Sequence, residues 1–127
     1  MSQMKNLLIL IILFATYPAW ADWVLLAEND GRPLYFEPSN VIKSGYMRRV
    51  WIIKDKSDDS AENNQSLRSR FEIDCNLRRY RVLSATIYSE PMGRGKKIEA
   101  VGESVLWDLI RSNGSPMDAL LHKVCVK

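Results

Sequence analysis

The chain has 127 residues, with 18 Lys plus Arg against 15 Asp plus Glu and one His, for a formal net charge of +3. This length predicts a single domain, and the near balance of charge excludes a strong electrostatic bias toward one class of partner. A domain this small buries only about two thirds of its unfolded surface, so a covalent constraint would add usefully to its core.

Residues 1–21 have the three parts of a secretory signal peptide. Lys5 supplies the positive charge, residues 7–15 form an unbroken apolar run, and Ala19-Trp20-Ala21 is the small-x-small sequence after which a signal peptidase cuts. The alternative is a membrane anchor, but these nine apolar residues fall short of the roughly 20 that a spanning helix needs. We expect cleavage after Ala21 and a mature domain at residues 22–127.

The mature chain is expected to be exported and free of a lipid anchor. Bacterial lipoproteins need a cysteine directly after the cut, and this sequence has Asp22 there. Cleavage removes one cation and leaves 106 residues, in which 17 Lys plus Arg stand against 15 Asp plus Glu, a net charge of +2. No transmembrane segment is expected after processing, and the location is the periplasm, the cell surface or the medium.

The mature part follows mostly a period of two, with β-branched and aromatic residues in short runs between turn residues. The alternation is cleanest in residues 67–75, where Phe71 and Ile73 lie on one face and Glu72 and Asp74 on the other, so one face should be buried and the other wet. Strands are expected at residues 23–27, 34–36, 47–54, 67–75, 79–88 and 97–101. The chain is then expected to leave the sheet.

Residues 56–66 contain no large apolar residue, which predicts a loop between two strands. At the other end of the chain, Ser115 is a suitable helix N-cap, Pro116 suits the first helical position, and Asp118 favours the positive helix end. Apolar residues follow at i, i+3, i+4 and i+7, namely Met117, Leu120, Leu121 and Val124. The expected fold is α+β and rich in β: a single twisted antiparallel sheet of about six strands, with the C-terminal helix packed on one face.

Cys75 and Cys125 are the two cysteines of the chain. Export to an oxidising compartment favours a disulfide between them, because no other partner exists. A reactive or metal-binding thiol is the alternative, but the sequence has neither a CxxC motif nor a Cys/His cluster. Closing a loop of about 50 residues is expected to stabilise the fold by roughly 4 kcal/mol.

The sequence contains none of the motifs that would indicate an enzyme, a metal site or a cofactor. It lacks a Ser/His/Asp order, HExxH, a P-loop, GxGxxG and an EF-hand loop, so we expect no catalytic residues, no metal and no cofactor. His122 near the end of the helix is expected to be a surface or capping residue. Glu72 and Asp74 share a strand face, which could suggest acid/base chemistry, but because they alternate with Arg70 we expect a surface ion-pair ladder instead.

Basic residues in three segments suggest a binding face, because antiparallel pairing can bring them together. Nucleic acid is a natural partner for a basic, aromatic sheet face, but export argues against it. Outside the cytoplasm such a face would meet acidic glycans, lipopolysaccharide phosphates, anionic lipid headgroups or acidic patches on proteins, and the alternative is a charged face that serves solubility. The candidate ligand-binding residues are Arg48, Arg79, Arg81, Lys96 and Lys97, flanked by Tyr80 and Tyr88.

The mature chain also resembles the surface-adhesin protein E family of Gram-negative bacteria. The resemblance covers nearly the whole mature chain in order, and its most specific parts are Ile73-Asp74-Cys75, Arg79-Tyr80-Arg81-Val82-Leu83 and the closing Val124-Cys125. It implies an antiparallel sheet with a C-terminal helix tied down by the disulfide. The founding member is a dimeric outer-membrane lipoprotein adhesin that binds host extracellular-matrix proteins, so the resemblance implies an adhesin-like binding module and a homodimer. A periplasmic accessory or structural domain of the envelope, without a host ligand, is the second hypothesis.

Overall fold

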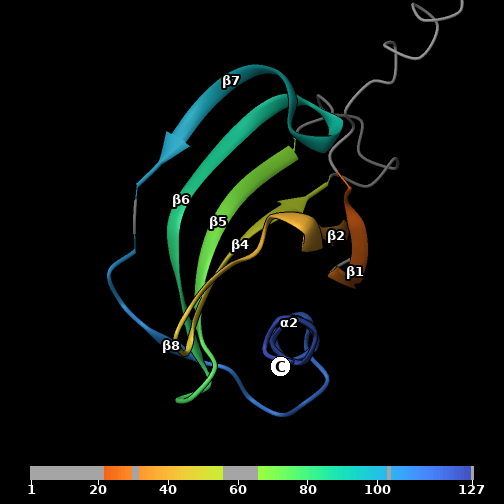
Figure 1. Ribbon diagram of the computed structural model, residues 1–127. Coiled ribbons are helices and arrows are strands. Elements are labelled where there is room, and N and C mark those ends of the chain that lie inside the picture. Colours follow the sequence, from red (N-terminus) through yellow and green to blue (C-terminus); the bar gives the residue numbers. More distant parts are fainter. Residues whose placement is uncertain (1–21, 30–31, 56–65, 103, 127) are drawn as a thin grey trace, which may run out of the picture.

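The computed structural model describes residues 22–29, 32–55, 66–102 and 104–126, which form an antiparallel sheet and a C-terminal helix (Figure 1). The expected signal peptide and residues 56–65 of the expected loop lie outside the described residues. In chain order the elements are β1 (Val24–Asn29), β2 (Arg32–Phe36), the short 3-10 turn η2 (Pro38–Asn40), β3 (Ile42–Ser44), β4 (Met47–Lys54), β5 (Ser66–Asp74), β6 (Arg79–Glu90), the 3-10 turn η3 (Pro91–Gly93), β7 (Arg94–Val101), β8 (Asp108–Leu109) and α2 (Pro116–Val124).

The strands that the structure describes belong to one open sheet of eight strands, in which every pairing is antiparallel. The main order is β1-β2-β4-β5-β6-β7, while β3 pairs with β4 and β8 pairs with β6. The α+β class and the single antiparallel sheet are therefore confirmed, and the six expected strands are all present. The expectation that the chain leaves the sheet after its sixth strand is wrong, because β8 returns to pair with Arg79 and Tyr80. A strand of two residues is too short to produce a recognisable alternation in the sequence.

The register of β4 against β5 divides their side chains between two faces. Val50 pairs with Phe71 on the face that packs against the helix, which we call the inner face. One residue further along, Trp51 pairs with Arg70 on the opposite face, the outer face. The inner face carries the core, and the outer face carries most of the cations, as the alternation in the sequence predicted.

Helix α2 begins as its sequence predicts. The Ser115 side chain accepts a hydrogen bond from the backbone N–H of Asp118 at 3.3 Å, and Pro116 occupies the first turn. Leu120, Leu121 and Val124 are buried against the sheet. They join one hydrophobic cluster with Phe36, Val50, Ile52, Ile73 and Ile110. The predicted packing of this helix on one face of the sheet is thus confirmed.

A disulfide joins the end of β5 to the end of α2. Cys75 follows the last residue of β5, Cys125 follows the last residue of α2, and their Cα atoms are 5.7 Å apart. The pairing expected from the sequence is confirmed. The bond closes a loop with a sequence separation of 50 residues, so it clamps the helix to the strand that runs through the middle of the sheet.

The helix covers only part of the inner face. It is nine residues long and lies inside the curve of the sheet, while β7 lies well away from it (Figure 1). The segment that enters the helix contributes Ile110, which is buried in the same cluster. Between this segment, the start of α2 and the inner face, a cavity remains open.

Candidate functional site

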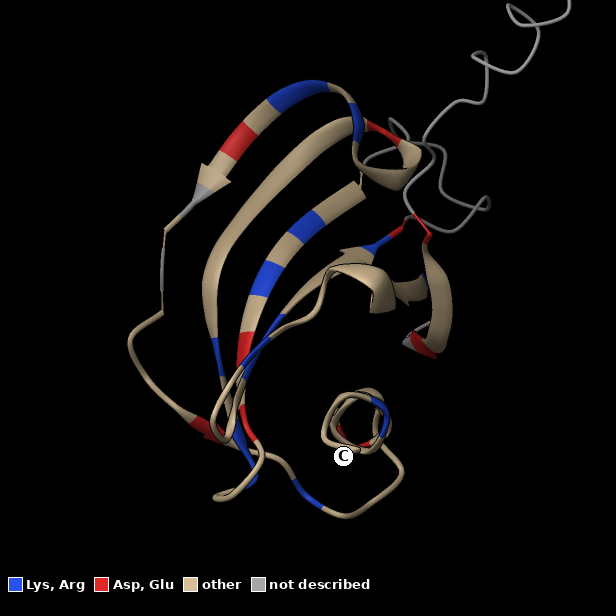
Figure 2. Cartoon of the chain, in the orientation of Figure 1, with Lys and Arg blue, Asp and Glu red and all other residues tan. Residues whose placement is uncertain are grey.

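The outer face divides into two halves along β5, whose basic residues lie nearer one end of the strand and whose acidic residues lie nearer the other (Figure 2). The half nearer the disulfide, which we call the paired half, holds carboxylates opposite its arginines; it consists of Arg49, Glu72, Asp74, Arg79, Arg81 and Trp107. In the other half, which we call the open half, two arginines lie over an aromatic ring and a lysine stands on the edge strand. The open half consists of Trp51, Arg68, Arg70 and Lys97.

Two buried carboxylates organise the paired half. Glu72 accepts hydrogen bonds from Arg81, at 2.6 Å from Nη2 and 2.9 Å from Nε, and from Arg49 Nε at 3.2 Å. Asp74 accepts one from Arg79 Nε at 3.1 Å. These residues are direct cross-strand neighbours, with Glu72 between Arg49 and Arg81. The ion-pair ladder predicted for Glu72 and Asp74 is therefore confirmed, but its cations are Arg49, Arg79 and Arg81 rather than Arg70, which lies over the Trp51 ring.

The surroundings of both carboxylates stabilise their charged forms. Burial by itself raises the pKa of Glu72, but the hydrogen bonds and charges of Arg81 and Arg49 outweigh it and hold that pKa below its usual range. Burial likewise raises the pKa of Asp74, while the backbone N–H of Leu77, the Arg79 side chain and a second backbone N–H lower it further than burial raises it. Both groups stay ionised at neutral pH, and the arginines beside them are neutralised.

Trp107 adds an aromatic cover to the paired half. It directly precedes β8, whose pairing with β6 brings it over that strand. The guanidinium of Arg79 lies 4.3 Å from its ring centroid and that of Arg81 lies 4.6 Å from it. Each of these arginines thus has both a carboxylate and an aromatic ring as partners, which leaves little of its charge available to a ligand.

The open half has the aromatic ring without the carboxylates. The guanidinium of Arg68 lies 4.3 Å from the centroid of the Trp51 ring, and that of Arg70 lies 5.5 Å from it. Neither arginine has a carboxylate partner among the residues that the structure describes. The Nε of Arg68 is buried and has no hydrogen-bond partner there. Such unpaired cations on an aromatic platform suit an anionic ligand.

The predicted lysines lie on the edge strand β7. Lys97 pairs with Tyr88, which in turn pairs with Ser66, so Lys97 is on the same face as the open half. Lys96 is its neighbour in sequence, and both lysines are exposed. Tyr88 is 9% exposed and so offers almost no aromatic surface to a ligand, contrary to the flanking role expected of it.

The expectation that all the candidate residues share one face is wrong for Arg48 and Tyr80. Arg48 pairs with Ile73, a core residue of the inner face, and its Nε donates to the carbonyl of Val124 at 3.1 Å. It therefore holds the C-terminal end of α2, where a cation is favourable. Tyr80 also faces inward and stacks on Phe71, with ring centroids 5.6 Å apart. Arg79 and Arg81 do lie on the outer face as expected.

Sequence reasoning missed the three central residues of the open half, Trp51, Arg68 and Arg70. A signal was available, because Arg68 and Arg70 are two residues apart in a strand of clear alternation and Trp51 stands at an outward position of the strand before it. Only the register brings Arg70 directly opposite Trp51, and the sequence does not specify that register.

We also considered a metal site, a role for His122 and a membrane-spanning helix. Within the described part of the chain, no group of three or more His, Cys, Asp or Glu side chains is placed to hold a metal ion. His122 is exposed, with its Nδ1 2.8 Å from the carbonyl oxygen of Asp118 one helical turn earlier. This placement agrees with the surface role predicted for it. Among the helices described, none is long and apolar enough to span a membrane.

Comparison with known proteins identifies the family. The family model of surface-adhesin protein E matches residues 23–126, which is nearly all of the chain that the structure describes. No curated protein and no solved structure matches the chain significantly. The match agrees with the resemblance seen in the sequence. The chain therefore belongs to the surface-adhesin protein E family.

Proposed function

We propose that this chain is an exported, adhesin-like binding module that holds acidic ligands on the outer face of its sheet. The family points to a surface or exported protein that binds external ligands rather than to an enzyme. The observation that carries the proposal is the open half, where Arg68 and Arg70 flank Trp51 and have no carboxylate partner among the described residues. The ligands we propose are acidic segments of host matrix proteins and acidic glycans.

The open half contributes more to this binding than the paired half. Arg79 and Arg81 are engaged by Asp74 and Glu72, so an acidic ligand has to compete with carboxylates already in contact. Among the described residues no carboxylate pairs with Arg68 or Arg70, and the Trp51 ring gives a ligand flat contact area at little cost in side-chain entropy. Lys97 extends the positive surface to the edge strand, where Lys96 is its exposed neighbour in sequence.

Binding through such contacts is weak singly and depends on salt. Exposed charge pairs contribute under about 1 kcal/mol each, so several must act together. Screening shortens their reach to about 8 Å at physiological ionic strength, so the affinity falls as salt is added. This dependence separates the proposed mode from binding through apolar contacts.

The experiment compares two triple variants of equal charge. Arg68→Gln/Arg70→Gln/Lys97→Gln removes three positive charges from the open half. Arg49→Gln/Arg79→Gln/Arg81→Gln removes three positive charges from the paired half. Binding to heparin, vitronectin and laminin is measured for both and for the wild type, at low and at physiological salt.

We expect the open-half variant to bind at least about tenfold more weakly than the wild type. The paired-half variant should lose less than half of that free energy. Equal losses in the two variants would mean that binding depends on the net charge of the protein and not on the open half. A wild type that binds none of the three probes would overturn the proposed function.

Export without a lipid anchor supports a second candidate function, a periplasmic accessory domain. Asp22 follows the proposed cleavage site where a lipoprotein has a cysteine, so we propose that the mature chain is not tethered to the outer membrane. Fractionation of the native cell with an antibody to the mature domain distinguishes the two. Surface or medium localisation supports the binding module, and strict retention in the periplasm supports the accessory domain.

A further inference from the structure

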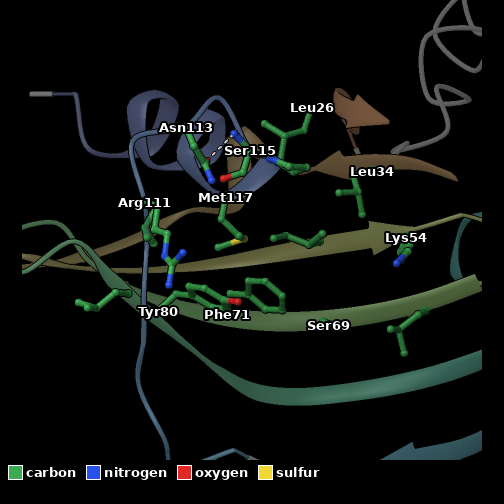
Figure 3. A pocket seen from close by; sticks show the side chains of 15 residues that line it. Leu26, Leu34, Lys54, Ser69, Phe71, Tyr80, Arg111, Asn113, Ser115 and Met117 are labelled. Atoms are coloured by element: carbon green, nitrogen blue, oxygen red, sulfur yellow. Dashed lines mark hydrogen bonds between the residues drawn. The ribbon is translucent and has the colours of Figure 1, made fainter. Parts of the chain in front are cut away.

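The inner face contains an elongated cavity of about 460 Å³ that the helix leaves open (Figure 3). Its walls come from β1, β2, β4, β5 and β6 on one side and from the segment 109–117 on the other. The lining is mainly apolar, with Leu26, Leu34, Ile52, Leu67, Phe71 and Met117. Its volume lies within the range of about 300–1,000 Å³ that is usual for sites of small molecules.

The charged side chains that line this cavity are all cations. They are Lys54 and Arg111, and no Asp or Glu is among the lining residues. Neither cation has an ion-pair partner in the parts of the chain that the structure describes. Figure 3 places Arg111 beside Tyr80 and Phe71, while Lys54 lies at the opposite end of the cavity. The charge of the cavity is therefore complementary to an anionic ligand with an apolar body.

The polar groups gather at the Arg111 end. Burial raises the pKa of the Tyr80 hydroxyl, and the charge of Asp108 raises it further, so the hydroxyl remains protonated and able to donate a hydrogen bond. Asn113 also lines this end, and its Oδ1 accepts from the backbone N–H of Ser115 at 3.0 Å. The apolar wall of Leu26 and Leu34 lies away from these groups.

We propose that this cavity binds a medium-chain fatty acid, with its carboxylate at Arg111 and Tyr80 and its acyl chain along the wall formed by Leu34 and Ile52. A guanidinium and a protonated hydroxyl that line the same end of a cavity match a carboxylate, and Arg111, an exposed residue, can reach this end from the solvent side. The wall beyond them is apolar apart from Ser69, as far as Lys54 at the other end, and a lysine stem of methylene groups can itself lie along apolar surface. This site lies on the face opposite the proposed acidic-ligand surface, so either proposal can fail without the other.

The first experiment measures chain length. The disulfide-bonded chain is freed of bound lipid by unfolding and refolding, and octanoate, decanoate and laurate are titrated by calorimetry, with decanol as the uncharged control. Each methylene added should tighten binding about threefold to fourfold, and decanol should bind at least about tenfold more weakly than decanoate. Equal affinity for all three acids, or none, would overturn the proposal.

The second experiment assigns the two ends of the cavity. Arg111→Gln should weaken laurate binding about tenfold, while Lys54→Gln should weaken it less than threefold. Arg32→Gln is the matched control, because Arg32 is exposed and does not line the cavity. If Arg111→Gln binds as the wild type does, the carboxylate does not lie there and the proposal is wrong.

A third measurement on the wild type does not depend on any variant folding. Laurate should shift the methyl NMR signals of Leu26, Leu34 and Ile52 and leave unchanged those of Ile98, which is exposed on β7. Filling the cavity with Ser69→Phe should abolish binding, because Ser69 is a buried lining residue. Shifts confined to Ile98 and its neighbours would contradict the assignment to this cavity.

Discussion

The paired and open halves of the outer face both carry arginines, but the side chains that contact these arginines differ. Arg79 and Arg81 meet carboxylates on the adjacent strand, whereas Arg68 and Arg70 meet only the ring of Trp51 among the described residues. The first arrangement neutralises its arginines within the fold, and the second is the basis of the proposed binding of acidic ligands. The number of arginines on a strand therefore says less about binding than the residues that stand opposite them.

The largest expected effect comes from removing the disulfide, which lies beside the paired half. Cys75→Ser/Cys125→Ser should lower the free energy of unfolding by about 4 kcal/mol, because the unfolded chain regains the entropy of a 50-residue loop. Urea unfolding measures this loss. Hydrogen exchange should show protection falling more at Asp74 than at Arg68, since Asp74 adjoins Cys75. An equal fall along β5 would show that the clamp does not favour the paired half.

The next largest effect should come from Glu72→Gln, which makes the paired half resemble the open one. Glu72 is 5% exposed and serves both Arg49 and Arg81, so its neutralisation should lower the free energy of unfolding by about 2 kcal/mol, discounted because both arginines are partly exposed. Binding of heparin should strengthen, because two guanidiniums are released. Glu99→Gln on the exposed edge strand is the control and should change stability by less than about 0.5 kcal/mol. Unchanged heparin binding would show that Glu72 does not limit ligand binding by Arg49 and Arg81, and it would contradict the distinction between the two halves.

Acid should destabilise the protein through the paired half. The folded state lowers the pKa of Glu72 and Asp74, so their contribution to stability is complete above their unfolded pKa of about 4 and is lost as the pH falls through the folded values. Urea midpoints measured from pH 6 to pH 3 should therefore fall at the acid end. Glu72→Gln/Asp74→Asn should flatten this dependence, and Arg68→Gln/Arg70→Gln should leave its slope unchanged. The same slope in all three proteins would assign the acid effect to other groups.

The smallest expected effects distinguish the two tryptophans. Trp107→Leu should lower the free energy of unfolding by about 1 kcal/mol, because its ring covers Arg79 and Arg81, and it should leave binding of acidic ligands nearly unchanged. Trp51→Leu should weaken that binding about threefold, since the platform beneath Arg68 and Arg70 is lost. Unfolding curves and heparin titrations of the two variants test this. Identical profiles would mean that the rings do not distinguish the halves.

Much of the fold was predictable because its signals are local. The helix begins at Ser115 and Pro116 as their capping preferences require, and the alternation in residues 67–75 assigned Ile73 to the core and Glu72 to the outer face. The disulfide followed from the presence of two cysteines in a chain that its sequence predicts to be exported. Strands β3 and β8 were not predicted, because segments of three and two residues are held by their partners rather than by their own pattern.

The candidate site was less predictable, because a bulge changes the phase of alternation within β6. Phe71 pairs with Val82 and Arg70 pairs with Ser84, so Leu83 is left without a partner. Residues on the two sides of such a bulge follow different alternations. The bulge therefore places Tyr80 and Tyr88 on different faces, although both are at even positions of β6. The inward position of Tyr80 itself follows from simple alternation, because it stands between Arg79 and Arg81 on the same strand.

The sequence by itself determined the covalent clamp, the capped helix and the alternation of the long strands, since each depends on residues that are neighbours or on a pairing without alternatives. Only the tertiary structure decided which arginines are neutralised, because Glu72 selects Arg49 and Arg81 through a register that joins three strands. It also decided that Arg48 holds the end of α2 and that a cavity with Arg111 remains beside the helix. These features combine residues from distant segments, so no local pattern specifies them.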